Sequence, residues 1–122
     1  MNINNTIITA VVIALIVLGA FWVAKYAKDS SAPNPALTAF AQCIASKGLT
    51  MYGAEWCSHC KAEKARFGAA FSYVPYVECP ENTKICLDKG INGYPTWVDA
   101  AGTKYEGQQG LERLAEISGC EL

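Results

Sequence analysis

Two cysteines separated by two residues, Cys57 and Cys60, are the clearest chemical feature of this chain. They follow a short apolar run and open a stretch with the composition of a helix. A thiolate in the first helical turn faces unpaired backbone N–H groups and the positive end of the helix dipole, which lowers its pKa. A cysteine three residues later lies one turn away and can attack a mixed disulfide formed by the first. The spacing predicts thiol–disulfide exchange, with Cys57 as the attacking thiol and Cys60 as the resolving thiol.

Two other uses of this pair remain open at the level of the sequence. A purely structural disulfide is disfavoured, because this pairing at a helix start is strained, accessible and easily reduced. A zinc site is disfavoured because the second cysteine pair available to it has six intervening residues. Its ligands would be Cys57, Cys60, Cys79 and Cys86, with His59 as a further donor. We therefore expect no metal and no cofactor besides the redox-active disulfide itself.

The N-terminal part of the chain reads as a membrane anchor. Residues 6–24 carry no charge and are dominated by Ile, Val, Leu and Ala, which is about the length needed to cross the hydrocarbon core of a bilayer. A cleaved signal peptide fits less well, because residues 1–5 lack Lys and Arg and bulky Trp22 stands where a small residue is preferred. We predict one transmembrane helix within residues 1–28. The net charge of −1 offers no basic surplus for nucleic acid.

The other four cysteines bear on compartment and stability. Six cysteines in 122 residues are typical of an oxidising, extracytoplasmic compartment. With the motif pair set aside, the remaining four allow three pairings. Cys79 and Cys86 flank a short loop, which favours a local disulfide and leaves Cys43 to pair with Cys120.

Two features of the sequence predict opposite orientations for the predicted anchor. Lys25 and Lys28 follow the apolar stretch, and the positive-inside rule alone would place the following domain in the cytoplasm. The cysteine content indicates the opposite side. We give the cysteines more weight, since two lysines beside Asp29 are a weak bias. The expected location is the cell membrane, with the domain extracytoplasmic.

Beyond the anchor the pattern predicts a polar connector at 29–35, reaching at most roughly 25 Å, and one α/β domain at 36–122. Strand–helix–strand, then a hairpin and a closing helix, predict a mixed sheet flanked by helices. The expected elements are helix 36–47, strand 50–54, a helix from 57 to about 71 with a weak point at Gly68, strand 73–79, a short helix or turn at 82–89, strands 96–99 and 103–106, and helix 111–117.

Two motifs in this arrangement resemble those of the thioredoxin superfamily. Residues 56–60, Trp-Cys-Ser-His-Cys, follow a predicted strand, and residues 93–96, Gly-Tyr-Pro-Thr, open a later one. The resemblance is more specific to the thioredoxin-like domain that accompanies bacterial vitamin K epoxide reductase homologues. It is carried by residues 51–54, 64–68, 76–79, 93–97 and 114–119.

The resemblance implies site residues beyond the two cysteines. Pro95 would follow a cis peptide bond and face the cysteine pair, and the backbone of Tyr94 would be exposed to an extended substrate. Proline suits this position because it has no N–H to compete with that substrate. Trp56 would lie at the rim of the site.

The sequence also departs from the common thioredoxin pattern. Many thioredoxins carry a buried carboxylate six residues before the first motif cysteine, where this chain has Met51. Ser58 and His59 lie between the cysteines. A histidine there can stabilise the thiolate of Cys57, which favours the reduced form and makes the disulfide more oxidising.

The resemblance implies a freestanding, membrane-anchored thiol–disulfide oxidoreductase. Its expected partners are exported cysteine-containing proteins, which receive disulfides, and an integral membrane, quinone-linked thiol oxidase of the vitamin K epoxide reductase type, which reoxidises it. Two alternatives stay open: a membrane-tethered reductant of exported thiols, and a redox-inert adaptor that only binds a membrane partner. A reduction potential separates the two enzymes, near about −120 mV for an oxidant and about −270 mV for a reductant.

Overall fold

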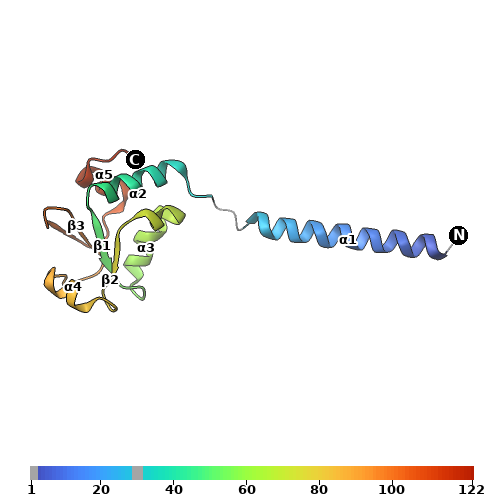
Figure 1. Cartoon of the computed structure of the whole chain (residues 1–122), viewed down its shortest axis with the longest axis horizontal. Helices are drawn as coiled ribbons and strands as arrows, with labels where there is room; N and C mark the ends of the chain where they lie inside the picture. Colours follow the sequence, from blue (N-terminus) through green and yellow to red (C-terminus); the bar gives the residue numbers. More distant parts are fainter. Residues whose placement is uncertain (1–2, 29–31) are drawn as a thin grey trace. The chain divides into compact units, whose positions relative to one another are not determined.

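The computed structural model describes residues 3–28 and 32–122. They divide into an N-terminal helical unit and a compact unit that begins at Pro33 (Figure 1). Positions 29–31 of the predicted connector lie outside the described residues.

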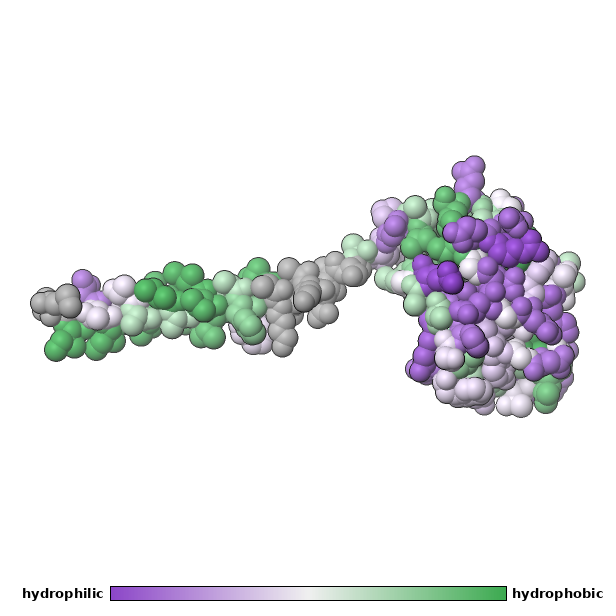
Figure 2. Space-filling view, turned by 180° about the vertical axis from the view of Figure 1, so that it is seen from behind, coloured by the Kyte–Doolittle hydropathy of each residue, from purple (hydrophilic) through white to green (hydrophobic). Residues whose placement is uncertain are grey.

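The N-terminal unit is helix α1 (Ile3–Lys28). Its segment Ile3–Val23 is long and apolar enough to cross a membrane, and none of it is buried. Figure 2 shows hydrophobic residues along this helix. A signal sequence near an N-terminus has the same length and composition, so the apolar helix is established and its use as an anchor stays a prediction.

The compact unit contains a four-stranded mixed sheet in the order β2-β1-β3-β4 (Figure 1). The strands are β1 (Thr50–Gly53), β2 (Tyr76–Glu78), β3 (Thr96–Val98) and β4 (Lys104–Glu106). β1 and β2 are parallel, whereas β3 pairs antiparallel with both β1 and β4. The parallel pair requires a helical crossover, which begins at the cysteine motif. The predicted α/β sheet flanked by helices is confirmed.

Five helical segments surround the sheet: α2 (Pro35–Ser46), α3 (Ser58–Phe67), the 3₁₀ helix η1 (Gly68–Tyr73), α4 (Thr83–Asp88) and α5 (Gly110–Ser118). Neighbouring strand residues point to opposite faces. Met51 and Trp97 therefore join one core cluster, to which α2, α3 and α5 contribute. Tyr52 and Val98 join the other cluster, with Cys86 of α4.

Two disulfides connect the elements. Cys43 in α2 is bonded to Cys120, just after α5, and Cys79 at the end of β2 is bonded to Cys86 in α4. This is the pairing that the loop lengths favour. Restriction of the unfolded chain would contribute about 4.5 kcal/mol for the longer loop and about 2.5 kcal/mol for the shorter one.

The predicted boundaries differ from the structure by more than one residue in one region. The helix expected to reach residue 71 ends at Phe67, because Gly68 adopts φ +55°, outside the helical region. The chain then continues as a 3₁₀ helix to Tyr73, and β2 begins at Tyr76 instead of 73. Pro75 precedes this strand and contributes only its carbonyl, which accepts the N–H of Met51 at 2.9 Å.

Candidate active site

Cys57 lies where β1 leads into α3, as the residue that caps this helix. Its Sγ accepts the backbone N–H of Cys60 at 3.4 Å, and both cysteines are free thiols. Burial raises the pKa of Cys57. Hydrogen bonds from the Cys60 side chain and from the backbone N–H groups of Cys60 and His59 outweigh burial, so the net pKa is lowered. The local fold thus activates Cys57 as a nucleophile.

Cys60 has the opposite electrostatic environment, although it is one turn away. Its side chain is fully buried, and burial is the largest of the effects that raise its pKa to about 11. A hydrogen bond from the Ala54 backbone and the charge of Lys64 lower the pKa of Cys60 but do not outweigh burial and the effects of Cys57. Because the pKa values are pushed apart, Cys57 loses its proton first and Cys60 stays a thiol. This matches an attacking and a resolving role.

The structure brings the other predicted rim residues to Cys57. The Tyr94–Pro95 peptide bond is cis, the geometry that the family resemblance implies. The Cys57 thiol donates to the Tyr94 carbonyl at 3.7 Å. Trp56 is 71% exposed and packs edge-to-face on Tyr94, with ring centroids 6.0 Å apart. An accessible aromatic side chain and the backbone of the segment before β3 therefore adjoin the attacking thiol.

His59 is exposed, and its imidazole is directed to another part of the domain. Its Nδ1 lies 3.2 Å from Oε1 of Gln108, in the segment before α5. The interaction of His59 with Cys57 identified above is made by its backbone N–H. Tuning of Cys57 by the imidazole stays a prediction.

Sequence reasoning missed a buried carboxylate next to the motif. Glu63, in α3, is fully buried, and its Oε1 accepts the Trp97 Nε1–H at 3.1 Å and the backbone N–H groups of Gln109 and Gly110 at 3.0 and 3.1 Å. It follows Cys60 by three residues and therefore shares its helix face. The spacing of three residues from Cys60 is the sequence feature that could have identified Glu63. Two residues of β2 were also not assigned to the site: Tyr76, whose ring borders Gly53 together with the Cys60 thiol, and Glu78, which accepts the Tyr76 hydroxyl.

The zinc alternative needs Cys79 and Cys86 as thiolate ligands, and in the structure they are bonded to each other. Within residues 3–28 and 32–122, no group of three or more His, Cys, Asp or Glu side chains is arranged to hold a metal.

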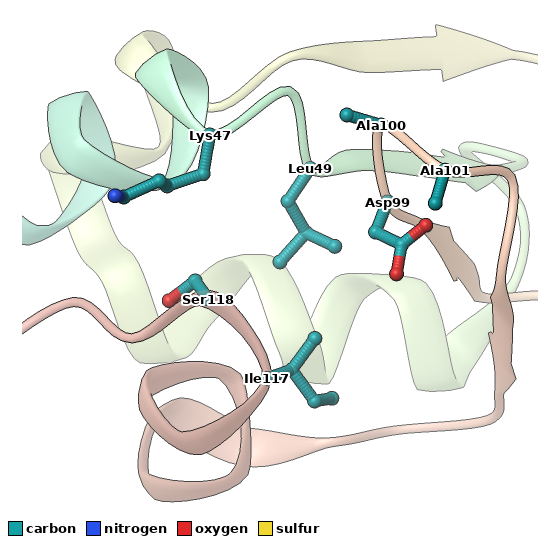
Figure 3. A pocket seen from close by; sticks show the side chains of 7 residues that line it. All are labelled: Lys47, Leu49, Asp99, Ala100, Ala101, Ile117 and Ser118. Atoms are coloured by element: carbon teal, nitrogen blue, oxygen red, sulfur yellow. The ribbon is translucent and has the colours of Figure 1, made fainter.

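A pocket lies at the other end of the sheet, where β1 begins and β3 ends (Figure 3). Figure 3 shows Leu49 and Ile117 facing it from different elements. The dithiol follows the opposite end of β1, so this pocket is separate from the site. It is lined by Lys47, Leu49, Asp99, Ala100, Ala101, Ile117 and Ser118.

Comparisons with known proteins agree with this geometry. No family model matches the chain. The chain is 40% identical over 102 residues to thiol-disulfide oxidoreductase LTO1 of Arabidopsis thaliana, covering 76% of this chain and 27% of the relative. The domain is thioredoxin-like. The thioredoxin-like domain is also 36% identical over 86 residues to protein disulfide isomerase-like 2-2 of Oryza sativa subsp. japonica, covering 60% of this chain and 23% of the relative.

The chain spans about a quarter of the length of these relatives. A probable protein disulfide-isomerase A6 of Medicago sativa is 31% identical over 86 residues, with 60% of this chain and 24% of the relative covered. The relatives' names and the unequal pKa values of Cys57 and Cys60 support thiol–disulfide oxidoreductase activity for the thioredoxin-like domain.

Proposed function

We propose that the protein is a membrane-anchored thiol–disulfide oxidoreductase that passes disulfides to exported cysteine-containing proteins. One observation carries the proposal: the activated thiol of Cys57 lies against the Tyr94 carbonyl and beside the exposed Trp56, with Cys60 buried behind it. A client thiolate attacks Cys57 in the oxidised pair, Cys60 leaves, and a second client thiol then displaces Cys57.

The apolar helix α1 and the cysteine content support an extracytoplasmic domain held at a membrane. The segment Ile3–Val23 meets the length and composition needed for a span. The disulfides Cys43–Cys120 and Cys79–Cys86 persist in oxidising compartments and are rare in a reducing cytosol.

We further propose that an integral membrane, quinone-linked enzyme of the vitamin K epoxide reductase type reoxidises the dithiol. The support is the resemblance of residues 51–54, 64–68 and 76–79 to the thioredoxin-like domains that accompany such enzymes. The predicted seven-residue connector, at most roughly 25 Å long when extended, also holds the domain near the end of the anchor, which favours a partner in the same membrane.

The direction of electron flow is tested by the reduction potential of the Cys57–Cys60 pair. We expect the full chain in detergent to equilibrate with glutathione nearer to about −120 mV than to about −270 mV. The reason is that hydrogen bonds stabilise the Cys57 thiolate and hence the reduced form. A potential near −270 mV would instead support the tethered reductant.

His59→Ala is expected to raise the pKa of Cys57 and to make the pair more reducing, because the histidine side chain would no longer stabilise the thiolate. The backbone N–H of residue 59 survives the substitution, so part of the stabilisation is retained. A pH titration of thiolate absorbance at 240 nm measures the change. As a control, Gln108→Ala removes the partner of the imidazole and leaves the ring. An unchanged titration in His59→Ala would remove the imidazole from the site.

A further inference from the structure

The dithiol leaves one step without an assigned residue, the transfer of the Cys60 proton. Cys60 must become a thiolate to resolve a mixed disulfide, and it must be protonated when it leaves the oxidised pair. Its side chain is fully buried, so bulk water does not reach it directly. Met51, at the strand position where many thioredoxins carry a carboxylate, has no proton to exchange. A different group has to act on Cys60.

Because Gly53 has no side chain, the Tyr76 hydroxyl and the Cys60 thiol can both approach its Cα. A Cβ at Gly53 would lie 2.8 Å from Cys60 Sγ, 3.2 Å from Tyr76 Cε2 and 3.3 Å from Tyr76 Oη. The thiol and the phenol therefore both border the same small space. Any larger residue at Gly53 would fill it.

Tyr76 connects that space to a carboxylate. Its hydroxyl donates a hydrogen bond of 2.5 Å to Oε2 of Glu78, two residues along β2 and hence on the same face. The other carboxylate oxygen, Oε1, accepts the backbone N–H of Glu55 at 2.9 Å. Glu78 is thus held by the loop that leads to Cys57. Burial, then Glu78, raises the pKa of Tyr76, so the phenol stays neutral and keeps a proton directed at Glu78 Oε2.

A positive charge lies over the same ring. Lys64 Nζ is 3.6 Å from the centroid of the Tyr76 ring, and it follows Cys60 by one turn of α3. Such a cation–π contact fixes the ring. The charge of Lys64 lowers the pKa of Cys60, and that of Cys57 raises it. The charged groups that affect the pKa of the Cys60 thiol are Cys57, which precedes α3, and Lys64 in α3. Those that affect the pKa of the Tyr76 phenol are Glu78 in β2, Cys60 in α3 and Glu55 in the loop after β1.

We propose that Tyr76 and Glu78 form a proton relay for the thiol of Cys60, with Lys64 as a positioning residue. The inference rests on the thiol–disulfide exchange proposed above. The thiol proton passes to Tyr76 Oη, after a rotation of the Cys60 side chain or through one water molecule, as the phenolic proton moves to Glu78 Oε2.

In resolution, the Cys60 thiolate uses an electron pair to form the S–S bond to Cys57. The bond between Cys57 and the client sulfur breaks, and the client sulfur leaves as a thiolate. The dithiol is oxidised by two electrons and the client disulfide is reduced. In the proposed physiological direction a client thiolate attacks Cys57, Cys60 leaves with the electron pair, and the proton returns from Glu78 through Tyr76.

The test is the stopped-flow reaction of the reduced full chain, in detergent, with the aromatic disulfide 5,5′-dithiobis(2-nitrobenzoate). Attack by Cys57 releases one coloured thiolate, and resolution by Cys60 releases a second. We expect Tyr76→Phe and Glu78→Gln to slow the second release by about 100-fold at neutral pH and to leave the first unchanged. Both variants preserve shape. Tyr105→Phe is the matched control, since its hydroxyl bonds Asp99 at the far end of the sheet.

The pH profile separates a relay from a structural role. In the variants the second rate should follow the fraction of Cys60 thiolate and rise about tenfold per pH unit below its pKa, whereas the wild type should vary much less over neutral pH. Unchanged second-step profiles in both variants would overturn the relay alone. A wild-type protein that releases only one thiolate would overturn the dithiol chemistry and the relay with it.

Discussion

Replacing Glu63 by alanine is expected to destabilise the thioredoxin-like domain by about 3 to 5 kcal/mol, because two buried donors and one partly buried donor lose their acceptor. Two of these donors, the N–H groups of Gln109 and Gly110, belong to the start of α5. Gln109 provides no side-chain cap for that helix. The Glu63 carboxylate of α3 therefore caps α5 in place of a side chain from its own first turn. Its negative charge also interacts favourably with the N-terminus of α5.

Urea unfolding of the oxidised protein would measure this loss. Glu63→Gln is the matched variant, since its amide oxygen can still accept from Trp97 and the two backbone groups, and we expect it to retain most of the stability. Glu116→Ala removes an exposed carboxylate paired with Arg113 and should change the free energy of unfolding by about 0.5 kcal/mol or less. A loss below about 1 kcal/mol in Glu63→Ala would show that water replaces the carboxylate.

The parts of the site that could be predicted from the sequence are local patterns. Cys57 and Cys60 are identified by their spacing and by the strand that precedes them, and Tyr94–Pro95 by the resemblance of residues 93–96 to a motif of the thioredoxin superfamily. The sheet followed from the alternation of apolar residues and from turn signals. Each of these depends on residues that are neighbours in the sequence, which is why a sequence pattern can indicate them.

The remaining parts depend on contacts between distant segments. The groups that donate hydrogen bonds to Glu63 lie 34 to 47 residues after it in the sequence. From the sequence alone, a single Glu in a helix with many charged residues is expected to be exposed to solvent. Likewise, Tyr76 comes near Cys60 only because β2 pairs with β1 in a register that sets it opposite Met51, from where its ring borders Gly53. The end of α3 at Phe67 was missed by a few residues, since Gly68 was recognised as weak but not as a stop.

Cys60→Ser is expected to stop turnover and to accumulate a covalent complex between Cys57 and its natural partners. The hydroxyl of serine cannot resolve a disulfide, whereas the hydrogen bonds to Cys57 from the N–H groups of residues 59 and 60 survive the substitution. Attack therefore proceeds and release does not. The serine side chain is also small enough for the space beside Gly53.

The trapped complexes are identified by non-reducing electrophoresis and mass spectrometry of the full chain expressed in cells. With a short connector after the predicted anchor, we expect an integral membrane protein with reactive cysteines, together with exported clients. Cys57→Ser/Cys60→Ser is the control and should trap nothing, because the disulfides Cys43–Cys120 and Cys79–Cys86 offer no free thiol. Recovery of cytosolic proteins alone would overturn the extracytoplasmic location. An alkylatable Cys57 that traps no protein would favour the redox-inert adaptor over either enzyme.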